Sequence, residues 1–133
     1  MLGAVDRFYA GLNANNGVAP ADLADGCTWT LNGMQTPAAC AQPFTNRQFG
    51  SLEQVRDIEV IAVDEARGLV AVSQFEDFPA TQQEFTDAAG GTYKDHETYP
   101  RTQQVVELFR FSNGKIEAVH AITSELPYGM KPR

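Results

Sequence analysis

A glutamate and a histidine lie within VVELFRFSNGKIEAVHAI, a stretch whose pattern is otherwise that of a buried β-hairpin. A carboxylate hydrogen-bonded to one ring nitrogen of a histidine fixes the imidazole tautomer and raises its basicity, so that the imidazole can move a proton near neutral pH. The Asn113-Gly114 pair predicts a two-residue type I′ turn, because both central positions of that turn need a positive φ. Counting outward from the turn places Glu107 directly opposite His120. The sequence therefore predicts an acid–base dyad in which His120 is the proton shuttle and Glu107 orients it.

The Glu107–His120 dyad also has a purely structural explanation, as a buried pair whose two groups satisfy each other. Burying ionisable groups is costly unless they are paired, and this cost makes such pairs commoner at functional sites than in plain cores. We therefore favour the functional interpretation. The other face of the hairpin is also apolar and carries Val106, Leu108, Val119 and Ala121. If that face were the concave one, the dyad would lie at a subunit interface.

Charged and aromatic residues elsewhere extend the candidate site. Asp57 is a candidate second acid or base, and Arg56 beside it is a candidate for substrate binding. The structural explanation of these charges is a cross-strand ion pair between Arg56 and Glu76. Trp29 lies in a predicted strand, where it is either a core residue or an aromatic wall for a flat ligand.

The segment YKDHETYPR adds two tyrosines and a histidine near the start of a predicted strand. Tyr93 and Tyr99 are candidates to hydrogen-bond a substrate oxygen, and His96 between them is a further candidate for substrate binding. The run 95–97, Asp-His-Glu, does not predict a metal site, because consecutive strand residues point to opposite faces and chelate poorly. A solvated loop explains this run better.

The first element that must position these residues is a helix. In MLGAVDRFYAGLNANNG, apolar residues recur at spacings of three and four, and Gly17 follows as a C-terminal stop. This spacing predicts an amphipathic helix whose apolar stripe is formed by Leu2, Val5, Phe8, Tyr9 and Leu12.

The rest of the chain predicts mainly strands. A short helical piece is expected at Ala19–Asp25, a strand at CTWTLNG and a short helix at TPAACAQPF. A long hairpin, VRDIEVIAVDEARGLVAVSQFEDF, then precedes the hairpin closed by Asn113-Gly114. This order predicts an α+β fold in which a curved antiparallel sheet is covered on one face by the N-terminal helices. The cone between the sheet and the helices is a natural ligand pocket.

Composition limits the partners and the compartment. The chain reads as one globular domain, 1–133, and its net charge of −7 with scattered basic residues argues against nucleic acid and anionic membranes as partners. No apolar run approaches the roughly 20 residues of a membrane span, and no signal peptide is visible at Met1. Cys27 and Cys40 are the only cysteines, too few for a zinc site. Their disulfide would indicate secretion and two free thiols a cytoplasmic location, so the localisation stays open.

Three stretches resemble a known family. The helix VDRFYAGLNAN, the hairpin VIAVDEARGLVAV and above all ELFRFSNGKIEAVHAITSELPYGM are similar to the SnoaL-like branch of the NTF2-like superfamily, in particular its fungal and bacterial members. The resemblance implies a cone formed by a curved sheet and covering helices, often dimeric through the outer sheet face. Members include ketosteroid isomerase, polyketide cyclases, scytalone dehydratase, limonene epoxide hydrolase and domains that only bind.

Only a few residues of this sequence match functional residues of the family that it resembles. Arg56 and Asp57 resemble the arginine and aspartate that epoxide hydrolases of this superfamily hold inside the cone, but the second aspartate of that motif is not evident. The resemblance therefore does not imply epoxide opening. His120 lies where several members place cavity residues.

These observations predict a cofactor-independent acid–base enzyme of the isomerase, dehydratase or lyase type. Its substrate would be a small, mainly apolar, ring-bearing molecule bound in the cone. No Gly-rich phosphate loop, G-x-S-x-G elbow or H-E-x-x-H motif is present, so neither a cofactor nor a metal is expected. The alternatives are a non-catalytic binding or dimerisation module and an accessory subunit of a larger enzyme. A pocket of a few hundred Å³ that reaches His120 would favour the enzyme.

A homodimer is expected from the second face of the last hairpin. Pairing of Arg110 with Glu117, Leu108 with Val119 and Val106 with Ala121 would give an apolar centre with a charged end. Such a patch suits an isologous two-fold contact between sheets.

Overall fold

The computed structural model describes residues 1–47, 52–79, 81–86, 89–90 and 92–132 of the chain, with the side chains of 38, 81–86 and 92–98 outside the description. The described helices and strands follow one another along the chain as α1 (Leu2–Ala14), β1 (Leu23–Leu31), β2 (Met34–Ala39), α2 (Ala41–Thr45), β3 (Gln54–Asp64), β4 (Leu69–Phe78), β5 (Thr81–Thr86), β6 (Thr92–Thr98), β7 (Arg101–Ser112) and β8 (Lys115–Pro127).

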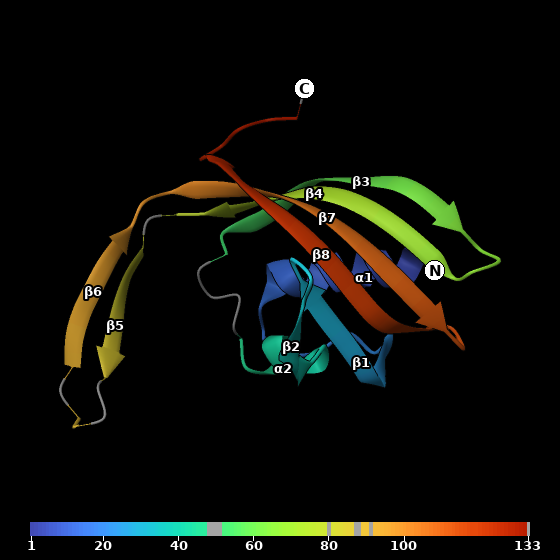
Figure 1. The fold of residues 1–133 in the computed structure, drawn as a ribbon, viewed down its shortest axis with the longest axis horizontal. Coiled ribbons are helices and arrows are strands. Elements are labelled where there is room, and N and C mark those ends of the chain that lie inside the picture. The colour runs from blue at the N-terminus through green and yellow to red at the C-terminus, as the bar shows by residue number, and fades with distance from the viewer. Residues whose placement is uncertain (48–51, 80, 87–88, 91, 133) are drawn as a thin grey trace.

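Six strands form one sheet in the order β2-β1-β8-β7-β4-β3, and this sheet curves over α1 (Figure 1). The α+β fold with a helix-covered curved sheet is confirmed. The sheet is mixed, however, because β1 pairs parallel to β8, so the expectation of an all-antiparallel sheet was wrong. Hairpin signals report only strands that are neighbours in sequence, whereas the β1–β8 pairing joins the two ends of the chain.

The predicted apolar stripe of α1 packs into the core, with Val5, Phe8, Tyr9 and Leu12 buried. Leu2 is exposed at the start of the helix, so its assignment to the buried stripe was wrong. Phe8 is the centre of the aromatic cluster, with its ring centroid 5.1 Å from that of Phe109, 5.3 Å from Phe44 and 5.5 Å from Trp29. α1 is thereby fixed against the inner face of the sheet, with its side chains directed at β7 and β1.

The segment between α1 and α2 differs from its prediction. The expected helical piece at Ala19–Asp25 is a turn followed by β1, because the backbone N–H of Ile116 donates to the Asp22 carbonyl and continues the pairing with β8. Within TPAACAQPF, Thr36 and Pro37 belong to β2, and the short helix starts only at Ala41. Long-range strand pairing here overrides the local preference.

Cys27 of β1 and Cys40, next to α2, form a disulfide that closes this part of the fold. Of the two alternatives that the sequence left open, the structure contains the disulfide. Among the described residues, neither helix is long and apolar enough to cross a membrane.

The strands β5 and β6 form a separate two-stranded ribbon, which continues from β4 and β7 and extends away from the main sheet (Figure 1). The run 95–97 lies within β6, so its interpretation as a solvated loop was wrong. The ribbon begins just beyond Phe78 and returns at Arg101, whose guanidinium lies 4.5 Å from the centroid of the Phe78 ring.

Candidate active site

The hairpin of β7 and β8 has the predicted turn but a different register. Asn113 and Gly114 have φ of 51° and 75°, and Ser112 pairs with Lys115 as predicted. Beyond Phe111 the register shifts by one residue, because Glu117 is an extra residue in β8. A bulge of this kind turns every following side chain of its strand to the opposite face.

The shifted register separates the predicted dyad, so the Glu107–His120 pairing was wrong. Glu107 pairs with Ala121 and is buried on the inner face, whereas His120 pairs with Leu108 and is exposed on the outer face. Because Glu107 and His120 do not pair, neither the catalytic nor the structural explanation of the dyad holds.

The inner face instead joins Glu107 to the N-terminal helix. The Tyr9 hydroxyl of α1 donates a hydrogen bond of 2.6 Å to Oε2 of Glu107, and both side chains are almost completely buried. Burial raises the pKa of the Glu107 carboxyl to about 8, against the lowering effect of the Tyr9 hydrogen bond. Burial and the neighbouring carboxylate also raise the pKa of Tyr9 well above its usual range. Glu107 is therefore a carboxylic acid that holds its proton near neutral pH.

A second carboxyl, Glu76 of β4, faces the same space. Alternation along GLVAVSQFED places Val70, Val72, Gln74 and Glu76 on the inner face. The Gln74 side-chain amide donates a hydrogen bond of 3.0 Å to Oε1 of Glu76. Burial raises the pKa of Glu76 to about 7, and the charge of Glu76 adds to the rise at Glu107.

Glu76 was not placed on the inner face of the sheet by the sequence analysis. The structural alternative for its charge paired it with Arg56, but Arg56 lies opposite Phe75 in the β3–β4 register and Glu76 lies opposite Val55. The period-two pattern of β4 was the signal that could have placed Glu76 inside, since it follows the buried valines at steps of two.

The two carboxyls line a cavity of about 460 Å³ between α1, α2 and the sheet. Trp29 contributes to the wall, so it lies where an aromatic surface for a flat ligand was predicted, and it also contacts Phe8 in the core. His120 does not line this cavity. The described lining residues are mostly apolar and include no lysine, arginine or histidine; they are Leu12, Trp29, Leu31, Thr36, Pro37, Pro43, Glu76, Phe78, Gln103, Val105, Glu107, Ala121 and Thr123.

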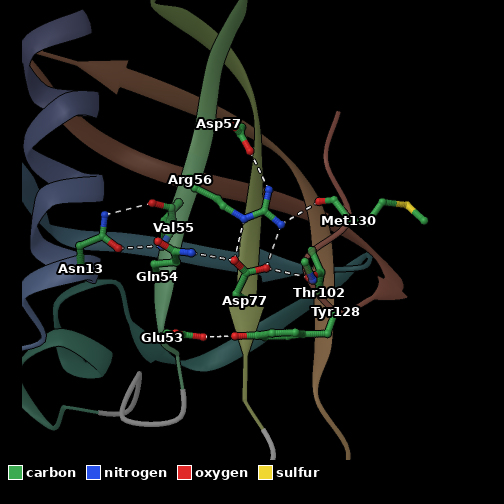
Figure 2. A network of polar contacts seen from close by, with 11 residues as sticks. Asn13, Glu53, Gln54, Val55, Arg56, Asp57, Asp77, Thr102, Tyr128 and Met130 are labelled. Atoms are coloured by element: carbon green, nitrogen blue, oxygen red, sulfur yellow. Dashed lines mark hydrogen bonds and ion pairs between the residues drawn. The ribbon is translucent and has the colours of Figure 1, made fainter. Parts of the chain in front are cut away.

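Arg56 and Asp57 lie away from the cavity, in the polar network that Figure 2 shows. The Arg56 guanidinium donates to both carboxylate oxygens of Asp77, at 2.6 and 2.9 Å, and to Asp57 at 2.6 Å. It also donates to the backbone oxygen of Met130 at 2.7 Å. The network thus fastens the C-terminal segment to the sheet, and it does not bring Asp57 to the cavity as a second acid or base.

Asp77 is the centre of this network. It also accepts hydrogen bonds from the Thr102 hydroxyl at 2.7 Å and from the Gln54 amide at 3.0 Å. These bonds, with that of Arg56 first among them, lower the pKa of Asp77 to about 2. Asp77 is therefore ionised at neutral pH, in contrast to Glu107 on the other face of the same sheet.

The remaining predicted residues do not meet at the cavity. Tyr99 is 70% exposed and donates a hydrogen bond of 3.4 Å to Glu125. Tyr93 and His96 lie in β6, and their side chains are outside the described part of the structure. In the described part of the chain, no three acidic, cysteine or histidine side chains are grouped so that they could hold a metal ion.

Solved structures share this architecture. A candidate polyketide cyclase from Xanthomonas campestris pv. campestris is 27% identical, with a TM-score of 0.62, over 91% of this chain and 87% of the other. An epoxide hydrolase of the LEH-like type from M. tuberculosis (14% identical, TM-score 0.58, covering 92% and 80%) and AusH from Aspergillus nidulans (11%, 0.57, 92% and 82%) share the fold alone.

Sequence comparisons define the family. No curated protein sequence matches the chain. The model of the family described as a domain of unknown function (DUF8021) matches residues 1–123. The structural neighbours confirm the NTF2-like fold that the resemblance implied. The chain therefore belongs to the DUF8021 family and has the NTF2-like fold.

Proposed function

We propose that the protein is a cofactor-independent acid–base enzyme that transfers a proton on a neutral, largely apolar, ring-bearing molecule held in the cavity. The observation that carries this proposal is the meeting of Glu76 and Glu107 in one cavity whose other described walls are mostly apolar. Paired carboxyls whose environments raise their pKa values to different extents are a recurring arrangement for acid and base roles at neutral pH.

The two carboxyls would divide the work according to their protonation. Glu107, which holds its proton to the higher pH, would donate a hydrogen bond or the proton itself to a substrate carbonyl or hydroxyl oxygen. Glu76 would remove a proton from the carbon next to that group. Return of the proton to another carbon is an isomerisation, and its transfer to a hydroxyl that leaves the neighbouring carbon as water is a dehydration. Trp29 would support the flat ring of the substrate.

The charge of the cavity supports a neutral substrate. No described lining residue carries a positive charge, and the acidic groups would repel a carboxylate or phosphate on the ligand. The name of the Xanthomonas relative, a candidate polyketide cyclase, adds support for a ring-bearing carbonyl compound.

Proton exchange tests the proposed function without knowledge of the natural substrate. We expect the protein to accelerate exchange of the acidic C–H protons of 2-tetralone or of smaller ring ketones into D₂O by 100-fold or more over buffer, as ¹H NMR would measure. Binding would be followed separately through the fluorescence of Trp29, the only tryptophan of the chain. Ketones that quench this fluorescence without faster exchange would indicate the non-catalytic binding module instead.

We also propose that the outer sheet face forms a homodimer. Leu108, Val106 and Ile122 are exposed there around His120, and the Arg110–Glu117 ion pair of 2.7 Å lies at the end of the patch. Val119 and Ala121, which we expected in this patch, are buried on the inner face because of the bulge.

The dimer is tested by sedimentation velocity at micromolar concentration. We expect twice the 14.5 kDa mass of the chain for the wild type. Leu108→Glu should sediment as a monomer, because it places like charges opposite each other across the two-fold axis. A wild type that sediments only at 14.5 kDa would contradict the proposal.

A further inference from the structure

Gln74 is a buried amide with only one of its two halves bonded. Its side chain is completely buried on the inner face of β4. The amide nitrogen donates to Glu76, but Oε1 has no hydrogen-bond partner among the described residues. A buried amide oxygen without a donor is costly, and native proteins rarely leave one. Gln74 therefore lies where a proton donor is needed.

The strand register places Gln74 between the two carboxyls. It is two residues from Glu76 on the same face of β4, and it pairs with Val105 of β7. Val72 pairs with Glu107, so that Gln74 and Glu107 are diagonal neighbours across the two strands. Long side chains can bridge this diagonal separation. The amide thus donates to Glu76 with its nitrogen, and its other half lies on the side of Glu107.

We propose that, in the protein without substrate, Gln74 is a positioning residue that couples the two carboxyls by donating its N–H to ionised Glu76 and accepting the acid proton of Glu107, and that a bound substrate oxygen takes this proton over from the amide. In this arrangement the pair shares a single proton. Glu76 is the base and Glu107 the acid, and the otherwise unpaired amide oxygen gains its donor. The assignment of these roles to catalysis rests on the proposed function, whereas the sharing of the proton does not.

The alternative arrangement explains why the amide matters. If the proton were on Glu76, the amide would have to rotate by 180° so that its oxygen accepted from Glu76 and its nitrogen donated to Glu107. The orientation in the structure, with nitrogen toward Glu76, agrees with the higher pKa of Glu107. Among the described side chains, Tyr9 of α1 is the other titratable group bonded to the pair, and it donates to Glu107. No charged side chain of β1 or β8 is among the described residues that line the cavity.

NMR titration of protein labelled with ¹³C at the glutamate carboxyl carbons tests the coupling without any ligand. Glu76→Gln and Glu107→Gln would assign the two signals, with midpoints expected at about 7 and about 8. In Gln74→Met the Glu76 midpoint should rise, because its carboxylate loses a donor, and the Glu107 midpoint should fall, because its acid form loses an acceptor. The gap of about one unit between the two midpoints should therefore largely close.

Gln104→Met is the matched control, since Gln104 is exposed on the other face of β7; it should move neither midpoint. A folded Gln74→Met protein with both midpoints unchanged would overturn the proposal. Should that variant not fold, the side-chain ¹⁵N signal of Gln74 in the wild type decides. It should shift with pH at both carboxyl midpoints, and a signal that follows neither would overturn the coupling. The result is independent of proton exchange on ketones, which tests only the catalytic use of the pair.

Discussion

Replacing Glu107 with glutamine should raise the free energy of unfolding by about 4 kcal/mol at pH 8 and by less than about 1 kcal/mol at pH 5. Burial raises the pKa of Glu107 from 4.5 to about 8 in the folded protein. Between pH 4.5 and about pH 8, the Glu107 carboxyl loses its proton in the unfolded chain but retains it in the folded protein. The stability that the wild type has below pH 4.5 is therefore progressively lost as the pH rises to 8. Glutamine stays neutral, and its oxygen can still accept the Tyr9 hydrogen bond.

Urea unfolding at the two pH values measures this effect. Glu59→Gln is the control, because Glu59 is an exposed glutamate of β3, and it should change the stability by less than about 0.5 kcal/mol at either pH. An equal effect of Glu107→Gln at pH 5 and pH 8, or a destabilisation at pH 8, would show that Glu107 is ionised in the folded protein.

Replacing Glu76 with glutamine should lower the rate of ketone proton exchange at pH 8 by 100-fold or more. The proposed base is the only group lost, since the amide keeps the shape of the side chain and its place in the cavity. Quenching of Trp29 fluorescence by the same ketone should persist, because binding depends on the apolar walls. An exchange rate equal to that of Glu59→Gln would place the base elsewhere.

The two expected results together indicate that the proposed function lowers the stability of the fold. A glutamine at position 107 would make the fold more stable at neutral pH, yet it would remove the proposed acid. Buried ionisable groups that reduce stability are typical of sites kept for chemistry. The opposite case in the same protein is Asp77, whose pKa is lowered by Arg56 and whose charge stabilises the folded state at neutral pH.

Local features of the chain predicted much of the fold. The apolar spacing of α1 and the Asn113-Gly114 turn depend on neighbours in sequence, so both were predicted correctly apart from Leu2. The α+β class and the NTF2-like resemblance follow from the order of such local signals. The sequence left Trp29 open between a core residue and a wall for a ligand, and in the structure it both contacts Phe8 and lines the cavity.

The tertiary structure alone decided the site. One extra residue in β8, Glu117, turned His120 to the outer face, and no local pattern marks a bulge that is stabilised by pairing with a neighbouring strand. Glu76 and Glu107 line the cavity and Tyr9 donates to Glu107, and these three groups come from a helix and two strands far apart in sequence. Their elevated pKa values arise from burial, which is a property of the packed fold and not of any of the three segments.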